Sequence, residues 1–285
     1  MKTADIQIRD PFIYVKDGYY YLYGSTDADI WKTRGHGFEG YRSRDLIDWE
    51  DLGNVLDRPE GYWGEINFWA PELHEYKGCC YLFASFKGTG FERGTAVFKA
   101  DKPEGPFRPW SRTALTPPEW SCLDGTLYVE DGQPYLVFCH EWTQIGDGEI
   151  CRLPLTQDLS APAGEPVTLF KATDAKWPKL VHHSSGKDGY VTDGPFMYTN
   201  VKGELLMLWS TLSQEGYALT TAKSASGKLE GPWLQRSTPF FNENGGHGML
   251  FRNLDGELML TLHSPNQTPF ERAQFIKVDE ATLFM

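Results

Sequence analysis

Residues 10–25 read DPFIYVKDGYYYLYGS, and the same pattern returns four more times along the chain. Each copy has an acidic or small residue, an apolar strand, a turn containing Gly or Asp, and a second strand that ends in Ser or His. The later copies are APELHEYKGCCYLFAS (70–85), DGTLYVEDGQPYLVFCH (124–140), DGPFMYTNVKGELLMLWS (193–210) and HGMLFRNLDGELMLTLHS (247–264). Two strands around a Gly-containing turn form a β-hairpin, so the sequence predicts five hairpins in phase.

A second pair of strands is predicted after each hairpin. The phrases that mark these pairs are 41–53, 97–107, 150–167 and 220–233, and the last unit ends with 273–280. Four strands per unit, repeated five times, are typical of an all-β, five-bladed β-propeller. A two-sheet sandwich is the structural alternative, but it does not explain five phased copies. We therefore expect residues 1–285 to form a single propeller domain, with blades starting near residues 10, 70, 124, 193 and 247.

The composition is acidic, because 39 Asp and Glu residues against 27 Lys and Arg residues give a formal net charge of −12. Binding to nucleic acid or to an anionic membrane surface needs a surplus of positive charge, so neither partner is expected. No stretch approaches the ~20 apolar residues that span a bilayer. Residues 1–12 contain no apolar signal segment. The sequence as it stands predicts a cytoplasmic protein, or a periplasmic or secreted one if a signal peptide has been removed.

The first strand of each propeller blade lines the central channel, so the residues that begin these strands meet at one mouth. They are Asp10, Ala70, Asp124, Asp193 and His247. Asp before Pro or Gly is a common turn residue, but three aspartates in phase on three blades indicate a shared site. Carboxyl groups crowded together away from water acquire different pKa values, so that one stays protonated while another is ionised. Such a pair is what cleavage of a glycosidic bond requires.

Five motifs make the chain resemble glycoside hydrolase family 43, in the family's order and over nearly the whole chain. They are IRDPF (8–12), FWAPELH (68–74), LDGTLY (123–128), TDGPFMY (192–198) and GGHGM (245–249). The resemblance implies that Asp10 is the general base that activates water. It also implies that Asp124 orients the general acid and tunes its pKa, and that position 193 holds this acid. His247 resembles the channel histidine that supports a central water or ion in related enzymes.

The family usually has Glu where this chain has Asp193, which is one methylene shorter. A loss of about 1 Å of reach is costly in proton transfer. Three explanations stay open: the backbone or the sugar lies closer, another residue is the acid, or the acid is lost. In the last case the protein is a non-catalytic carbohydrate-binding propeller. Glu141, in CHEW, is the first substitute acid, and Glu215 is a weaker one.

Aromatic side chains are expected to bind the sugar, because an aromatic face stacks on the C–H face of a sugar ring. Trp69, which precedes the second blade's motif, and Trp142, which follows an inner hairpin, both lie near the mouth. Trp63 suits such a site and packing between blades equally well, since most of ten tryptophans must pack in the core.

Polar sugar contacts are also expected, from Glu72, Glu141, His247 and Arg252. Glu72 suits a bridge between blades equally well, and Arg252 suits a solvated strand position equally well. No cofactor is expected, and no His/Asp cluster has the spacing of a catalytic metal site. A structural ion or water near His247 is the one bound species that the family resemblance suggests.

Taken with the resemblance, these residues predict an inverting exo-glycosidase. The expected substrate is a terminal α-L-arabinofuranoside on the side chain of a plant polysaccharide, presented on an oligosaccharide or on the polymer. A β-D-xyloside and a galactofuranoside are the alternative substrates, because their furanose or pentose outlines are similar. A glycoside phosphorylase is disfavoured, since the strand starts carry acids where a phosphate pocket needs positive charge.

Overall fold

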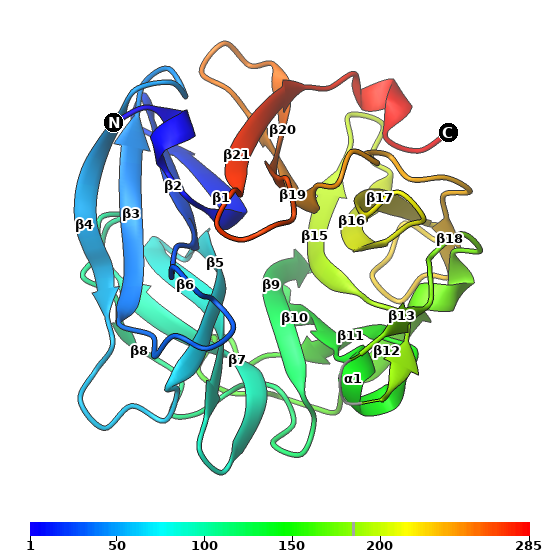
Figure 1. Cartoon of the computed structure of the whole chain (residues 1–285), viewed down its shortest axis with the longest axis horizontal. Coiled ribbons are helices and arrows are strands. Elements are labelled where there is room, and N and C mark those ends of the chain that lie inside the picture. Colours follow the sequence, from blue (N-terminus) through cyan, green and yellow to red (C-terminus); the bar gives the residue numbers. More distant parts are fainter. Residues whose placement is uncertain (184–185) are drawn as a thin grey trace.

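The repeated hairpins form the inner strands of five antiparallel sheets that stand around a central axis (Figure 1). The computed structural model describes residues 1–183 and 186–285. The pairing within each inner hairpin follows the predicted turns, as between Lys16 and Tyr19 and between Tyr76 and Cys79. The predicted five-bladed β-propeller is therefore confirmed, and so is its all-β class.

Each blade is a sheet whose strands follow one another from the axis outward. Blade one has β1 (Arg9–Lys16), β2 (Tyr19–Ser25), β3 (Gly37–Ser43) and β4 (Trp49–Asp57). Blade two has β5 (Ile66–Tyr76), β6 (Cys79–Gly88), β7 (Phe91–Ala100) and β8 (Arg108–Pro109). Blade three has β9 (Cys122–Glu130), β10 (Gln133–His140), β11 (Glu149–Pro154) and β12 (Val167–Lys171). Blade four has β15 (Asp193–Thr199), β16 (Leu205–Leu212), β17 (Tyr217–Ser224) and β18 (Trp233–Gln235), and blade five has β19 (Gly246–Arg252), β20 (Leu258–Ser264) and β21 (Arg272–Lys277).

Short elements fill the connections between the blades. They are α1 (Trp142–Ile145), the hairpin β13 (Val181–His182) and β14 (Asp188–Gly189), and the 3-10 turns at Thr3–Asp5, Ala172–Asp174 and Glu280–Thr282. The helices among the described residues are all too short or too polar to cross a membrane.

The fifth blade differs from the prediction of four strands, because it has three strands in the described part of the chain. Its last residues leave the blade and pack on blade four, where the Arg236 guanidinium donates to the carbonyl of Thr282 at 2.6 Å. The N-terminal residues lie between blades five and one, since Arg272 donates to the carbonyl of Ala4 at 2.7 Å and the Thr3 N–H donates to the carbonyl of Ile47 at 3.1 Å. The first and last blades therefore meet through side chains and loops.

The interfaces between blades are filled mainly by apolar side chains. One buried cluster joins the first two blades to the fifth, through residues such as Phe12, Phe86 and Phe251. Burial of a Phe or Leu side chain contributes about 1.5–3 kcal/mol to folding, so these clusters hold the blades in place. Trp63 belongs to this packing, since its ring lies 5.5 Å from Tyr62 and 6.0 Å from Phe86.

One left-handed residue marks the start of each inner strand. These residues and their φ angles are Asp10 (+53°), Ala70 (+46°), Asp124 (+57°), Gly194 (+51°) and His247 (+49°). The expectation that three aspartates share one phase is therefore wrong for Asp193, because Gly194 occupies that place in blade four. Asp193 stands one residue earlier, at the level of Arg9 and Trp69, and its side chain enters the channel from a different direction.

Most of these left-handed residues donate their backbone N–H to the end of a neighbouring blade's second strand. Ala70 donates to Ser25 Oγ (2.9 Å), Asp124 to Ser85 Oγ (2.8 Å), His247 to Ser210 Oγ (2.8 Å) and Asp10 to His263 Nδ1 (3.1 Å). Ser25, Ser85 and Ser210, which end three copies of the repeat, are thus explained as inter-blade hydrogen-bond acceptors, and in blade five His263, one residue before the end of its copy, takes this role. Left-handed backbone costs an ordinary residue roughly 1–2 kcal/mol, and these bonds help to offset that cost.

Candidate active site

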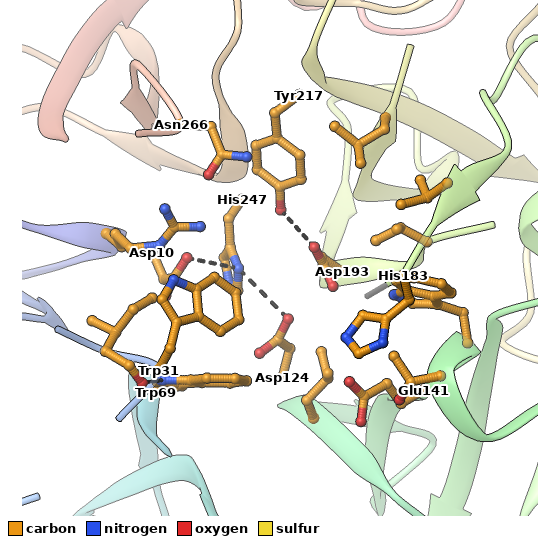
Figure 2. A pocket seen from close by; sticks show the side chains of 18 residues that line it. Asp10, Trp31, Trp69, Asp124, Glu141, His183, Asp193, Tyr217, His247 and Asn266 are labelled. Atoms are coloured by element: carbon orange, nitrogen blue, oxygen red, sulfur yellow. Dashed lines mark hydrogen bonds and ion pairs between the residues drawn. The ribbon is translucent and has the colours of Figure 1, made fainter. Parts of the chain in front are cut away.

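A pocket of about 360 Å³ opens where the inner strands begin, and Figure 2 shows its carboxylates converging on the axis. Among the described residues it is lined by Arg9, Asp10, Ile30, Trp31, Trp69, Leu123, Asp124, Glu141, Trp142, Thr143, Val181, His183, Val191, Asp193, Leu212, Tyr217, His247 and Asn266. Seven of the nine predicted site residues are in this set: Asp10, Asp124, Asp193, Trp69, Glu141, Trp142 and His247.

Asp10 is held as an anion. Its Oδ2 accepts from Ser25 Oγ at 2.7 Å, and its Oδ1 lies 3.1 Å from His247 Nδ1. Burial alone would raise the pKa of Asp10, but the charge of His247 and its hydrogen bond outweigh burial and hold the pKa well below its usual range. An ionised carboxylate at the mouth of a pocket has the form that a general base requires.

His247 is the positive charge at the centre of the cluster. Its Nδ1 lies 3.1 Å from Asp10 and 3.6 Å from Asp124 Oδ2. Burial works against the charged imidazolium, but the two carboxylates outweigh it and raise the pKa of His247 to about 10. The imidazolium therefore compensates part of the negative charge that the carboxyl groups bring into the channel.

Asp124 is buried and much less acidic than Asp10. Burial, with the charges of Asp193 and Asp10, raises the pKa of Asp124 to about 7 against the opposing effect of His247. The backbone N–H of Gly194 donates to its Oδ2 at 3.0 Å. Asp124 thus connects His247 to the strand that carries Asp193.

Asp193 has the environment of a proton donor. Burial raises the pKa of Asp193 to about 6, while His247 and the Tyr217 hydroxyl act in the opposite direction. The Tyr217 hydroxyl donates to Asp193 Oδ2 at 3.1 Å, a contact drawn as a dashed line in Figure 2. Two carboxyl groups of one pocket, Asp10 and Asp193, are thus pushed towards opposite protonation states.

Glu141 has the opposite character, although it lines the same pocket. Its Oε2 lies 2.6 Å from the Arg93 guanidinium and accepts from Ser121 Oγ at 2.7 Å. Burial would raise the pKa of Glu141, but Arg93 outweighs it and lowers the pKa below its usual value. An ion-paired carboxylate holds no proton to donate near neutral pH, which disfavours Glu141 as the substitute acid.

Trp69 forms an aromatic wall of the pocket. Its indole N–H donates to the carbonyl of Ile30 at 2.7 Å, and the Arg93 guanidinium lies 4.3 Å from the ring centre. Trp31 meets it edge-on, with ring centres 5.1 Å apart. Trp31 is 57% exposed, so the two indoles form an open corner suited to a sugar ring.

Two predicted contact residues lie away from the pocket. Arg252 ends β19, on the opposite side of the propeller from His247, and its side chain is 49% exposed. Five residues of strand span about 17 Å, which explains why it does not reach the mouth. Glu72 is buried deeper in the channel, where it pairs with His74 Nε2 at 3.0 Å, so its prediction as a pocket residue is wrong as well.

Neither of the remaining alternatives contributes to the pocket. Trp63 packs among core aromatics and lines a separate depression. Glu215 is exposed and accepts a hydrogen bond from Asn242. This position gives Glu215 no contact with the carboxyl cluster.

Several pocket residues were not predicted from the sequence. Trp31, His183 and Asn266 come from loops, and Tyr217 begins an outer strand of blade four. His183 meets Trp142 edge-on, with ring centres 5.7 Å apart. His183 lies beside His182 in the segment that precedes blade four, but nothing in that pattern distinguishes a pocket residue from a solvated one.

In the described part of the chain, no group of three or more His, Cys, Asp or Glu residues is arranged for a metal ion. The expectations that no cofactor is required and that an ion or water lies near His247 stay predictions.

Gly194→Ala is expected to destabilise the protein more than a matched Gly→Ala change. A Cβ at residue 194 would lie 2.8 Å from carbons of the His247 ring, in addition to the strain of a left-handed alanine. Gly203 is the control, because its φ is +77° and a Cβ there meets nothing within 4 Å. Left-handed strain alone costs roughly 1–2 kcal/mol. Equal losses in denaturant unfolding would show that the His247 ring moves freely out of the way.

Comparison with known proteins identifies the family. Residues 4–279 match Glycosyl hydrolases family 43. A crystal structure of an endo-arabinase from Bacteroides thetaiotaomicron is 39% identical, with a TM-score of 0.91 over 98% of this chain and 96% of that one. The extracellular exo-α-(1→5)-L-arabinofuranosidase of Cellvibrio japonicus is 23% identical over 86% of this chain and 71% of its own length. A xylosidase/arabinosidase of Butyrivibrio fibrisolvens is 28% identical over 53% of this chain and 30% of its own length. Since the family match spans nearly every residue of the propeller, the chain belongs to glycosyl hydrolase family 43 and is an inverting glycoside hydrolase.

Proposed function

We propose that this enzyme removes terminal α-L-arabinofuranose units from α-1,5-linked arabinan chains, with Asp10 as general base and Asp193 as general acid. The observation that carries the proposal is the pair of buried carboxyl groups with opposite protonation preferences in one small pocket. One of them is held ionised beside His247, and the other is kept protonated towards neutral pH by burial.

The reaction follows from these two states. Asp10 takes a proton from a water molecule as its oxygen attacks the anomeric carbon. The bond from that carbon to the glycosidic oxygen breaks, and Asp193 gives its proton to the departing oxygen. The water attacks from the face opposite the leaving group, so the configuration inverts. Asp124 contributes by the hydrogen bond that its Oδ2 accepts from the Gly194 N–H, which ties it to the strand of the acid.

The preference for a chain end is supported by the size of the pocket. Its volume of about 360 Å³ lies near the lower end of the ~300–1,000 Å³ typical of ligand sites. The corner of Trp31 and Trp69 closes one side, and Trp142 with His183 forms another. Such a pocket suits the end of a chain better than its middle. The arabinan preference comes from the Bacteroides and Cellvibrio proteins, whose names both specify arabinose chains.

Internal cleavage of arabinan is the second candidate, because the Bacteroides structure with 39% identity is described as an endo-arabinase. Product analysis on linear arabinan separates the two modes. An exo-enzyme releases arabinose from the first minutes while the polymer remains long, whereas an endo-enzyme produces short oligosaccharides and a rapid loss of viscosity. Early oligosaccharides without free arabinose would contradict the exo mode.

The sugar itself is tested on aryl glycosides of α-L-arabinofuranose, β-D-xylose and β-D-galactofuranose. We expect the highest kcat/KM on the arabinofuranoside. A higher value on the xyloside or galactofuranoside would replace the proposed sugar while leaving the roles of the carboxyl groups in place.

The pH dependence is expected to show an alkaline limb near pH 6. Asp193 must be protonated to act, and its pKa of about 6 means that kcat/KM falls about tenfold per pH unit above that value. The acidic limb of the profile, which Asp10 sets, lies at a much lower pH, because the pKa of Asp10 is held well below the usual range. Initial rates on an arabino-oligosaccharide would be measured from pH 4 to 9, with unfolding followed in the same buffers. A rate that stays constant to pH 8 would contradict the assignment.

A further inference from the structure

We propose that Tyr217 is a positioning residue for the general acid, holding the Asp193 carboxyl so that the proton to be transferred is carried by Oδ1. The proposal rests on the proposed role of Asp193. The Tyr217 hydroxyl donates to Oδ2 at 3.1 Å. An oxygen that accepts this bond is the carbonyl oxygen of the protonated acid, so the proton takes the other oxygen.

Tyr217 is itself held rigidly. It is buried, and its ring stacks on His263 with centres 5.5 Å apart and planes inclined by 23°. Its backbone N–H donates to Asn244 Oδ1 at 3.3 Å. A Cβ at Gly246 would lie 2.6 Å from the Tyr217 ring, so the glycine leaves the space that the ring fills. These contacts leave the hydroxyl little freedom to turn away from Asp193.

The stacked rings of Tyr217 and His263 also contact the general base, Asp10. His263 Nδ1 accepts the backbone N–H of Asp10 at 3.1 Å, and its Nε2 lies 3.3 Å from Asn266 Oδ1. Burial, together with the charge of Arg9, lowers the pKa of His263 to about 3, so the ring is neutral and acts as an acceptor at Nδ1. Tyr217 and His263 therefore form one packed unit that touches the acid by a hydroxyl and the base by a ring nitrogen.

The packed Tyr217–His263 unit is important for catalysis because the side chain of the general acid, Asp193, is short. Asp193 lacks the extra methylene of the family's usual glutamate, so its carboxyl has fewer orientations from which it reaches the leaving oxygen. A fixed donor on one carboxyl oxygen selects among those orientations before substrate binds. Errors of about 1 Å in a catalytic group cost large factors in rate, and a preorganised hydrogen bond avoids them.

The electrostatic effect of Tyr217 has a definite sign. The charged and titratable groups that act on Asp193 include His247, Asp10 and Asp124 from the other inner strands, the buried Cys139 thiol of β10, and Glu141 just before α1. The phenolic donor favours the ionised form of Asp193 and so lowers its pKa against burial. Removing the hydroxyl while those groups remain must raise the pKa of Asp193.

The experiment is Tyr217→Phe, which removes the hydroxyl and keeps the ring on His263. We expect the alkaline limb of kcat/KM to move up by about one pH unit, because the loss of a hydrogen bond to the ionised carboxyl group favours its protonated form. At the pH optimum, kcat on an arabino-oligosaccharide should fall about tenfold. The rate on an aryl arabinofuranoside with a good leaving group should change much less, since that bond hardly needs protonation.

Tyr21→Phe is the matched control, because the Tyr21 hydroxyl also binds a carboxylate, Glu104 at 3.1 Å, but this contact joins β2 of blade one to the β7–β8 loop of blade two, and neither residue is among those that line the pocket. It should change neither the limb nor the leaving-group dependence. Site-specific replacement of Tyr217 by 3-fluorotyrosine gives a second test with little change of shape. The fluorinated phenol is a stronger donor, so the alkaline limb should then move to lower pH.

The outcomes separate this proposal from the proposed function. Equal losses on both substrates with an unmoved alkaline limb in Tyr217→Phe, or an unmoved limb with 3-fluorotyrosine, would overturn the role of Tyr217. If Asp193→Asn shows no dependence on the leaving group, the acid assignment itself fails and the Tyr217 proposal fails with it.

Discussion

Asp10→Asn is expected to lower kcat by about 10²- to 10⁴-fold on every substrate, with a much smaller effect on KM. The range is that of a lost general acid or base. Asparagine has the same size and tolerates the left-handed backbone at this position, but its amide cannot accept a proton from water. The loss should be independent of the leaving group, because the base acts on the nucleophile. Steady-state kinetics on an aryl arabinofuranoside and on arabinotriose would check it.

Asp17→Asn is a matched control for this change. Asp17 is also left-handed, with φ of +52°, but it lies in the β1–β2 turn at the other end of the propeller from the pocket. Its kinetics should equal those of the wild type. If Asp10→Asn retains more than a tenth of the wild-type kcat while the control is normal, another residue activates the water.

Asp193→Ala is expected to abolish turnover of natural arabino-oligosaccharides while sparing substrates with good leaving groups. A sugar leaves poorly without a proton, so kcat should fall about 10²- to 10⁴-fold. A nitrophenolate leaves readily, so the loss there should be about tenfold or less. The alkaline limb of the pH profile should also disappear, since the group that titrates there is gone. A series of aryl arabinofuranosides of graded leaving-group pKa measures the effect.

Glu141→Gln distinguishes the two acids that the sequence left open. If Glu141 only binds substrate beside Arg93, its variant should raise KM and keep the alkaline limb and the shallow leaving-group dependence of the wild type. A steep leaving-group dependence in Glu141→Gln, with an unaffected Asp193→Ala, would transfer the acid role to Glu141.

The fold was predictable because the repeat is visible in the chain. Hairpin turns such as Asp17-Gly18 recur in phase, and the apolar alternation on either side fits only strands. The carboxyl cluster was predictable for the same reason, since strand starts of a propeller converge on its axis. The position of Arg252 could also have been predicted, because five residues of extended chain separate it from His247 and place it on the far side of the molecule.

The remaining features depend on information that periodicity does not carry. Asp193 lies one residue before the position that Asp10 and Asp124 occupy, because Gly194 is the left-handed residue of blade four. The sequence repeat alone aligns the three aspartates. Trp31 and His183 come from loops whose course is set by tertiary contacts, such as the Trp31–Trp69 and Trp142–His183 ring pairs. Arg93 was missed because its partner Glu141 is 48 residues away in the chain.

The joint between the first and last blades has a consequence for the newly made protein. A nascent chain that has emerged through blade four already carries Asp10, Asp124 and Asp193, but it lacks His247, which compensates part of their negative charge, and His263, which accepts a hydrogen bond from the backbone of the base. The charges of the pocket are therefore balanced as in the mature enzyme only after blade five has been synthesised. Hydrolytic activity should appear in a translation reaction as a late, abrupt event, at the moment when the two ends of the ring meet.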